Sequence, residues 1–191
     1  MQNFLPYPDF EKSAQVLDNK RLVKQNLETR QCLNALCFNG GWRNHPAVVA
    51  WENNILGLVY YGLAINAECV KRGFKDNKNE YDKYLEYCKV NQISKTYPAW
   101  LGDERIHSSH RSRLLCKGLI DSLCNGIKKH LKIKKIDDWC KQEFKLTKNQ
   151  LRYEHITRLS EIIYKHGISY KINHYDQFGW KDDPSKPYIW L

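Results

Sequence analysis

The sequence predicts an all-α protein, a compact helical bundle built as one domain over residues 1–191. Apolar residues recur at helical spacing along most of the chain, and helix start and stop signals flank these stretches. Glycine (10 residues) and proline (6 residues) are sparse, so we find no linker that would divide the chain. A chain of 191 residues is long enough for one well-filled core and too short for two large domains.

The first two helices have clear start and stop signals. The first is predicted to span residues 9–36, with Asp9 as its N-cap, and to stop at the turn-forming sequence "NGG". The second is predicted to begin at Pro46, because proline is favoured in the first helical turn. It is predicted to end at "KRGF", where Gly73 takes the C-cap position.

The rest of the chain is also predicted to be mainly helical. A third helix is expected within residues 79–92 and a fourth from about residue 103 to residue 117, after an extended connection. Residues 118–150 are lysine-rich and only loosely amphipathic, and we interpret them as a helical insertion. Thr147 and Gln150 have the spacing of a capping box, which predicts a last helix ending at the sequence "KHG".

The charge balance favours a polyanionic partner. The chain has 31 Lys and Arg against 21 Asp and Glu, a net charge of +10, which indicates nucleic acid first and an anionic membrane second. The longest nearly apolar run, residues 55–65, is too short to span a bilayer, and the N-terminus lacks the pattern of a signal peptide. Seven cysteines without a CxxC pair argue against a zinc ribbon and favour a reducing, cytoplasmic location.

A polar stripe runs along the first predicted helix. At about 100° per residue, Leu17, Arg21, Lys24, Glu28 and Gln31 fall within about 40° of one line down the helix. The stripe contains one acid among bases. Exposure to solvent is one interpretation of such a stripe, and contact with a polyanion is the other.

A second candidate lies in the sequence "GWRNHPAVVAW". It places Trp42, Arg43 and His45 just before a helix N-terminus, where free backbone N–H groups and a guanidinium can bind a phosphate. The alternative is that Trp42 belongs to the core and that His45 only caps the helix. Both interpretations stay open on the sequence.

A third candidate is "HSSHR", which places His107 and His110 at i, i+3 spacing beside Arg111. Two histidines at this spacing can bind a metal ion, but a zinc site needs a third ligand and there is no HExxH motif. Phosphate binding or structural hydrogen bonding is therefore favoured. No Walker loop, GxGxxG or GxSxG sequence occurs either.

The C-terminal tail is irregular and rich in aromatic residues. Such side chains can stack on unpaired bases, or they can dock a terminal segment onto a helical core. We expect at least half of them to dock. They are Tyr175, Phe178, Trp180, Tyr188 and Trp190.

Several segments resemble the pyrimidine-dimer DNA glycosylase family. The sequence "INAECVKRGF", preceded by "HPAVVAWENNILGLVYYGLA", is similar to the second core helix of that family. The segments "MQNFLPYPDF", "LDNKRLVKQNLET", "GWRNHPAV", "WLGDE" and "HSSHR" also resemble a bacterial branch of it. The resemblance covers residues 1–117 and, more weakly, the aromatic tail, and it implies a compact all-α domain.

The resemblance also implies a reaction. Members of the family cut the glycosidic bond of a damaged pyrimidine and then break the strand at the abasic site, as glycosylase and AP lyase. Their nucleophile is the N-terminal α-amine, which forms a Schiff base with the sugar, and their essential acid lies on the first long helix, where Glu28 matches it. Because the bulk of Gln2 hinders removal of the initiator methionine, the amine is expected on Met1, or on Gln2 if Met1 is lost.

These inferences give a partner and two alternatives. The resemblance implies a monomer that binds double-stranded DNA with a damaged or modified pyrimidine, without membrane, metal or organic cofactor, in a bacterial or virus-infected cell. One alternative is a nucleic-acid-binding protein that has lost the chemistry. The other is a metal-dependent phosphodiesterase that uses His107, His110 and His45. The predicted DNA contacts are Arg21, Lys24, Arg43, His45, His110 and Arg111.

Overall fold

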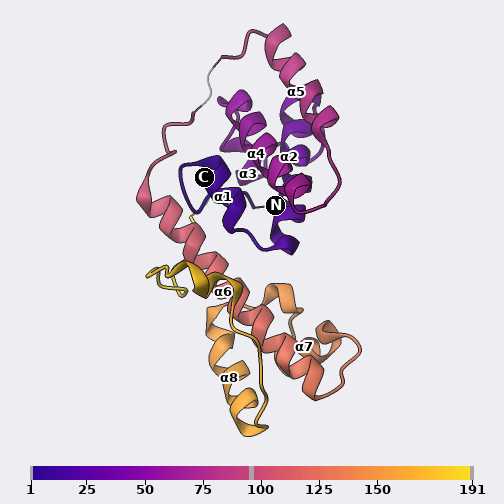
Figure 1. Cartoon of the computed structure of the whole chain (residues 1–191), viewed down its shortest axis with the longest axis vertical. Helices are drawn as coiled ribbons and strands as arrows, with labels where there is room; N and C mark the ends of the chain where they lie inside the picture. Colours follow the sequence, from indigo (N-terminus) through magenta and orange to yellow (C-terminus); the bar gives the residue numbers. More distant parts are fainter. Residues whose placement is uncertain (1, 95–96, 190–191) are drawn as a thin grey trace. The chain divides into compact units, whose positions relative to one another are not determined.

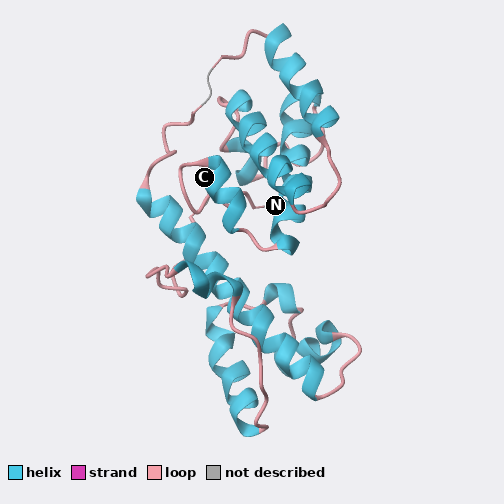
Figure 2. Ribbon diagram, in the orientation of Figure 1, coloured by secondary structure: helices cyan, strands magenta, loops and turns pink. Residues whose placement is uncertain are grey.

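The computed structural model describes residues 2–94 and 97–189. Within these residues the chain is helical and contains no strand, which confirms the all-α prediction (Figure 1 and Figure 2). The α-helices are α1 (Phe10–Val16), α2 (Asn19–Phe38), α3 (Pro46–Val49), α4 (Ile55–Lys71), α5 (Lys78–Val90), α6 (Glu104–His130), α7 (Ile136–Phe144) and α8 (Ile156–Lys165), and the short 3₁₀ helices are η1 (Lys148–Gln150), η2 (Tyr153–His155) and η3 (His174–Phe178).

The internal contacts of the chain divide it into two compact units. The N-terminal unit comprises residues 1–110 and 189–191, and the second unit comprises residues 111–188. The second unit therefore contains the lysine-rich region 118–150 together with the segments that flank it. The prediction of one domain with an insertion at that region stays a prediction.

The first predicted helix is interrupted. Asp9 caps α1 as predicted, because its carboxylate accepts a hydrogen bond from the backbone N–H of Lys12. The chain then leaves the helix at Leu17, which has ψ 137° and is fully buried, and Asp18 starts α2 as a second N-cap. The guanidinium of Arg72 donates to the backbone oxygens of Gln15 and Leu17 and so stabilises the break. The prediction of a single helix was wrong here, and Leu17 is not part of the polar stripe.

The second predicted helix is also interrupted. Pro46 begins α3 as predicted, but α3 is only four residues long, and turns at residues 50–54 precede α4. Trp51 in this connection is fully buried, with its ring stacked on Tyr61 and edge-on to Trp100. The burial of this large ring accompanies the break that the sequence pattern did not predict.

The third helix is confirmed as α5, whereas α6 is longer than predicted. Instead of ending at residue 117, α6 continues to His130, because its apolar positions go on at helical spacing. Ile120, Leu123 and Ile127 are buried on this continued face. The region that looked only loosely amphipathic thus carries a regular apolar stripe.

The last helix has the predicted end but not the predicted start. The capping box of Thr147 and Gln150 is present, yet it caps the short helix η1 and not a long one. Helix α8 begins at Ile156, and Gly167 follows its end in left-handed backbone conformation, with φ 57°. The capping-box pattern identified a helix start but not the length of the helix.

Helices α4, α5, α6 and α8 end in the same hydrogen-bonded motif, in which a left-handed residue follows the last turn. Glycine takes this position after α4 (Gly73) and after α8 (Gly167). Gln92 takes it after α5, and Lys132 takes it after α6, with φ values of 55° and 52°. A residue with a Cβ atom costs roughly 1–2 kcal/mol in this conformation, so α5 and α6 end less favourably.

Helices α2, α4 and α5 pack together in the N-terminal unit (Figure 1). Gly62 of α4 allows the ring of Tyr81 to lie against the helix, since a Cβ atom there would collide with that ring. A buried polar network joins the three helices: the Asn66 amide bonds to Asn26 and Asp76, and the Tyr81 hydroxyl donates to Asn26. The asparagine in "INAECVKRGF" is therefore a structural residue.

The second unit has its own core. Apolar side chains of α6, α7 and α8 are buried against one another, and partly buried residues such as Trp139 and Phe144 cover them. No helix in the described part of the chain is long and apolar enough to cross a membrane. All seven cysteines are buried as free thiols. The buried core residues are Cys116, Ile120, Leu123, Cys124, Ile127, Cys140, Leu151, Leu159, Ile163 and Ile168.

Candidate active site

Residues 2–5 form an N-terminal strap that is packed into the N-terminal unit. Asn3 and Leu5 are fully buried and Phe4 is 6% exposed, although the first residues of a chain are usually poorly ordered unless something holds them. The backbone oxygen of Phe4 accepts a hydrogen bond from the Tyr61 hydroxyl of α4 at 2.8 Å. The strap is thus held by both side chains and backbone.

Gln25 of α2 holds the middle of the strap. Its side-chain oxygen accepts the backbone N–H of Phe4 at 3.0 Å, and its side-chain nitrogen donates to the Asn3 side chain at 3.1 Å. Gln25 is almost completely buried, so these bonds replace water that both groups would otherwise bind. It lies one helical turn before Glu28, which brings the strap onto the face of α2 that carries this acid.

His107 and His110 of α6 hold the end of the strap. The backbone N–H of Leu5 donates to Nδ1 of His110 at 2.9 Å, and Nδ1 of His107 lies 2.7 Å from the backbone oxygen of Leu5. The Gly102 N–H donates to Nε2 of His107, so the proton of that ring is on Nδ1. Both rings are fully buried, and these contacts favour a structural role over the predicted phosphate contact of His110, which stays a prediction.

The carboxylate of Glu28 lies beside the start of the strap. Its Oε2 atom is 3.3 Å from the backbone nitrogen of Gln2, which donates to it, and its Oε1 atom is 3.8 Å from Nζ of Lys24. The Glu28 side chain is only 13% exposed, whereas that of Lys24 is 66% exposed. Burial raises the pKa of the neighbouring Cys32 thiol to about 12, and the Glu28 carboxylate acts in the same direction, which disfavours the nucleophilic thiolate form.

The other predicted DNA contacts of the N-terminal unit have protein partners. Arg21 forms an ion pair with Asp18, and Arg43 forms one with Glu52 at 3.0 Å. The Nδ1 atom of His45 accepts the Ala47 N–H and caps α3. Burial lowers the pKa of the His45 imidazole, while the Glu28 carboxylate opposes this shift. Contact of these residues with DNA stays a prediction.

Trp42 lies in the turn before α3. Its side chain is 70% exposed and its backbone is left-handed, with φ 74°. Of the two interpretations left open by the sequence, the one that places this ring in the core is therefore contradicted. An exposed aromatic ring in such a conformation is unusual and offers a surface on which a base can stack.

The remaining predicted residues lie in the second unit or outside the described residues. Arg111 is 8% exposed and forms an ion pair with Asp182 at 2.7 Å, so its predicted contact with DNA stays untested. In the tail, Tyr175 is fully buried and stacks on Trp180, which agrees with the docking interpretation for these two rings. Met1 lies outside the described residues, as does Trp190.

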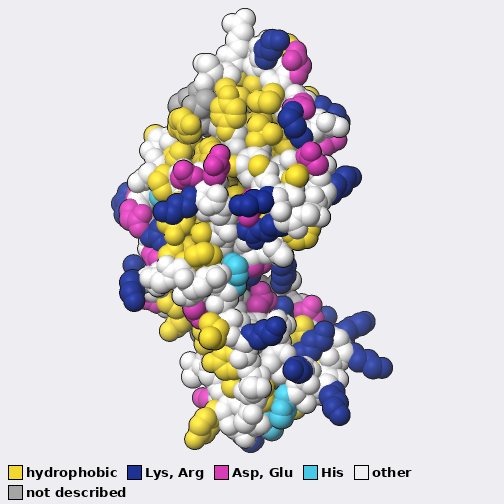
Figure 3. All heavy atoms as spheres, viewed as in Figure 1, with side chains coloured by type: hydrophobic (Ala, Val, Ile, Leu, Met, Phe, Trp, Pro, Cys, Tyr) yellow, Lys and Arg dark blue, Asp and Glu magenta, His cyan; other side chains and the backbone are white. Residues whose placement is uncertain are grey.

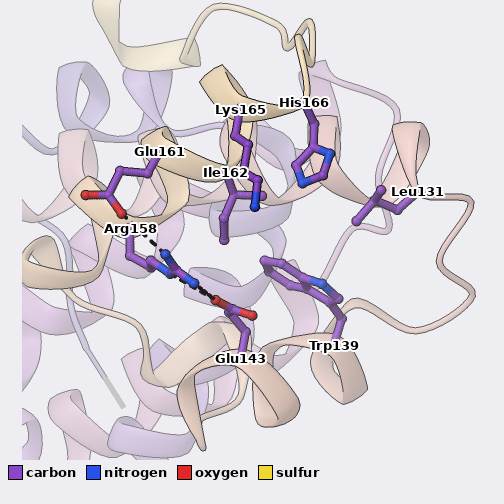
Figure 4. Close-up of a pocket in the computed structure, with 8 residues that line it drawn as sticks. All are labelled: Leu131, Trp139, Glu143, Arg158, Glu161, Ile162, Lys165 and His166. Carbon is purple, nitrogen blue, oxygen red and sulfur yellow. Dashed lines mark hydrogen bonds and ion pairs between the residues drawn. The ribbon is translucent and has the colours of Figure 1, made fainter.

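A pocket of about 230 Å³ occurs in the second unit (Figure 4). Arg158 crosses it and forms ion pairs with Glu143 and Glu161, which balances the charge of its lining. None of the residues predicted as catalytic or DNA-binding lines it. Within the described residues there is also no group of three or more His, Cys, Asp or Glu side chains that could hold a metal ion. The lining residues are Leu131, Trp139, Glu143, Arg158, Glu161, Ile162, Lys165 and His166.

Sequence reasoning missed the residues that position the strap. Gln25 carried a weak signal, since it is a polar residue one turn before Glu28, but nothing in the spacing indicated that Tyr61 would bond to Phe4. Together these residues bring the second backbone nitrogen of the chain to a nearly buried carboxylate. Such an arrangement can hold a cationic or nucleophilic nitrogen next to a proton acceptor.

Comparison with known proteins adds one finding. Residues 1–82 match a family model described as pyrimidine dimer DNA glycosylase. The match confirms the resemblance over this segment, which contains Gln2 and Glu28 and ends within α5, whereas His110 and Arg111 lie beyond it. No curated protein and no solved structure matches the chain.

Proposed function

We propose that this protein is a DNA glycosylase with AP lyase activity that removes pyrimidine dimers or related damaged pyrimidines from double-stranded DNA. The observation that carries the proposal is the hydrogen bond from the Gln2 nitrogen to the Glu28 carboxylate at 3.3 Å. It lies inside the segment that matches the glycosylase family. The nucleophile is the α-amine of Met1, or that of Gln2 if Met1 is removed.

The chemistry of an α-amine supports this assignment. Its unperturbed pKa is about 7.7 to 8, against about 10.4 for lysine, so roughly a tenth of it is neutral at pH 7, against less than one part in a thousand for lysine. The neutral amine attacks C1′ of the damaged nucleotide while the bond from C1′ to the base breaks and the base leaves with its electron pair. The amine nitrogen then loses a proton, the bond from C1′ to the ring oxygen O4′ breaks, and O4′ gains a proton as the sugar ring opens to the protonated imine.

In this proposal Glu28 has two roles. Its negative charge stabilises the positive charge that develops on the sugar and then on the iminium, and the nearly buried environment strengthens this effect. Glu28 then accepts the C2′ proton, so that the bond from C3′ to the phosphate oxygen breaks and the strand is cut. Water releases the sugar from the amine and regenerates it.

The strap supports the proposed position of the amine beside Glu28. Bonds from Gln25, Tyr61, His107 and His110 hold the backbone of Phe4 and Leu5, which limits the motional freedom that the residues before them lose when substrate binds. A damaged base must leave the stack to be reached, at a cost of a few kcal/mol that a lesion lowers. The exposed ring of Trp42 is available to stack on a base in this process.

Borohydride trapping tests the proposal. The protein is incubated with a duplex that contains a pyrimidine dimer or an abasic site, and borohydride reduces the imine to a stable covalent adduct. Peptide mapping should place the adduct on the α-nitrogen of the first residue, and protein with an acetylated α-amine should form none. An adduct on a lysine would overturn the assignment of the nucleophile, and the absence of any adduct would favour a binding protein without chemistry.

A chelator separates the metal-dependent alternative. If His107 and His110 only hold the backbone of Leu5, nicking of lesion-containing DNA persists in excess EDTA. A loss of nicking that zinc or manganese restores would instead favour the phosphodiesterase.

A further inference from the structure

The positive charge of the chain is concentrated in the second unit. Of the 31 Lys and Arg residues, 17 lie in residues 111–188, together with 9 of the 21 Asp and Glu residues. This unit therefore has a net charge of +8, whereas the N-terminal unit has +2. The segment that matches the glycosylase family lies wholly in the nearly neutral unit.

Five lysines at the junction of α6 and α7 form what we call the lysine turn. All five side chains are exposed, and Figure 3 shows Lys and Arg side chains gathered on the side of this unit that carries α7. Ile133 and Ile136, which alternate with the lysines, pack against the core of the unit and anchor the turn. The lysine turn consists of Lys128, Lys129, Lys132, Lys134 and Lys135.

The lysine turn differs from the lysines of the N-terminal unit in its partners. On α5, Lys78 pairs with Asp82 and Lys83 pairs with Glu80 within the same helix. In the described residues no carboxylate is within ion-pair distance of a lysine of the turn, although Asp137 and Asp138 follow it at the start of α7. The charge of the turn is therefore available to an external anion.

The backbone at Lys132 is strained. Lys132 takes the left-handed position after α6, where glycine ends α4 and α8 in the same motif. Glycine would avoid the strain, so a lysine there lowers the stability of the turn. Gln92 takes the same conformation after α5, so the strain alone does not mark a DNA contact, but it makes Lys132 a position where backbone and charge can be tested together.

Stabilisation of helix ends does not account for the whole turn. Lys128 and Lys129 lie in the last turn of α6, where a cation is favourable for the helix dipole. Lys132 and Lys134 lie beyond that helix, and Lys135 precedes the N-terminus of α7, where a cation is unfavourable. These three lysines need another explanation.

We propose that the lysine turn binds the phosphate backbone of duplex DNA, and that it supplies most of the sequence-independent affinity of this protein for its substrate. The proposal rests on the proposed function, because that function requires DNA. The chemical reason is that exposed lysines without protein partners displace condensed counterions from DNA, while paired lysines must first lose a carboxylate. The duplex bound at the turn need carry no lesion.

The main test compares two variants with the same change in net charge. One replaces Lys128, Lys129, Lys134 and Lys135 by Gln, and the other replaces four exposed lysines of the N-terminal unit. Binding of an undamaged duplex of about 20 base pairs is followed by fluorescence anisotropy between about 50 and 200 mM NaCl. The control is Lys75→Gln, Lys78→Gln, Lys83→Gln and Lys89→Gln, all in or before α5.

The two variants should differ clearly. Each lost phosphate contact reduces the magnitude of the slope of log affinity against log salt by about 0.9. The slope of the lysine-turn variant should therefore be smaller in magnitude by about 3 to 4, and this variant should bind at least roughly tenfold more weakly at low salt. The α5 variant should change the slope by less than about 1. Equal slopes in the two variants would overturn the proposal, because only the total charge would then matter.

A second pair of variants uses the backbone. Lys132→Gly removes one cation and relieves the left-handed strain, so the unfolding temperature should rise by about 4 °C while the salt slope falls by about 1. Gln92→Gly relieves the same strain after α5, so it should raise the unfolding temperature without a change in DNA binding. If Lys132→Gly leaves DNA binding unchanged, the lysine at this position has no role in it and the proposal fails.

These measurements separate the present proposal from the proposed function. They use undamaged DNA, so a wild-type protein that forms no borohydride adduct can still show the loss of slope in the lysine-turn variant. A wild-type protein that forms the adduct while both four-lysine variants bind alike would contradict only the lysine turn. The last experiment measures binding of the protein to vesicles of phosphatidylserine and phosphatidylcholine. Tighter binding to vesicles than to DNA through the same lysines would overturn the choice of DNA as the partner.

Discussion

The two units differ in charge balance. The N-terminal unit contains 14 Lys and Arg residues and 12 Asp and Glu residues, and many of its basic side chains pair with an acid nearby in the chain. The second unit contains 17 Lys and Arg residues and 9 Asp and Glu residues, and its lysine turn has no such partners in the described residues. The net charge of +10 hides this difference. Catalysis by a carboxylate and an amine requires that the two groups are held in a fixed geometry with few competing charges nearby. Binding of a phosphate backbone instead requires an excess of exposed cations.

Glu28→Gln should have the largest effect of the substitutions, and it should distinguish the catalytic role of the N-terminal unit from the DNA-binding role of the second unit most clearly. The amide keeps the shape of the side chain but loses the charge and the ability to accept a proton. Base excision should fall by about 10²- to 10⁴-fold, while binding of undamaged DNA stays unchanged. Single-turnover excision and anisotropy on the same protein measure both, with Glu80→Gln on α5 as a control that should change neither. If Glu28→Gln lost DNA binding to the same extent as excision, the assignment of catalysis and DNA binding to different units would be wrong.

Arg72→Ala should destabilise the N-terminal unit alone. Arg72 bonds to two backbone oxygens at the break between α1 and α2, to Asn19 and to Glu68. Its loss should lower the free energy of unfolding by about 2–3 kcal/mol. Hydrogen exchange read by peptide should show faster exchange in α2 while α8 keeps its protection. Arg158→Ala, which breaks the ion pairs with Glu143 and Glu161 on the surface of the second unit, should cost less than about 1 kcal/mol.

Gln25→Leu tests whether the strap is a precondition for the chemistry. The change leaves the Phe4 N–H and the Asn3 side chain without their Gln25 partner, at a cost of about 1–3 kcal/mol. Faster exchange of the Phe4 amide should accompany slower excision, with DNA binding unchanged. Gln31→Leu, on an exposed position of α2, should leave all three unchanged. Full excision activity in a variant with a mobile strap would remove the strap from the mechanism.

Replacement of His45 should have the smallest effect, and this effect on the stability of the protein should depend on pH. Because its pKa is lowered in the folded protein, the unfolded chain binds more protons below the unfolded pKa of about 6.5. The contribution of neutral His45 to stability is therefore fully present above that pH and decreases as the pH falls through this value. His45→Asn keeps a good N-cap residue, so its unfolding temperature should fall less between pH 7 and pH 5 than that of the wild type. An equal fall would assign the pH dependence to other groups.

Local chemistry explains which parts of the fold were predictable. Asp9, Pro46 and Gly167 mark helix ends through their own side chains or backbone, and all three do so in the structure. The break at Leu17 depends on Arg72, which is 55 residues away in the chain, and no local pattern contains that information. Distant partners therefore decided the interruptions that the sequence did not reveal.

The candidate site shows the same division. Glu28 was assigned through the family resemblance, and the structure brings its carboxylate to the Gln2 nitrogen. His107 and His110 have a spacing that suits metal or phosphate, yet their ring nitrogens bond to the backbone of Leu5. Spacing shows which side chains share a helix face, but it does not show what lies opposite that face.

The contact between Leu5 and His110 has a consequence for the order of folding. The two residues are 105 positions apart, so the strap is synthesised long before α6 and cannot form its last bonds until the start of α6 is available. Contacts between residues this far apart in the chain form slowly compared with local helices, so the strap should reach its buried position after α2 and α4 have formed.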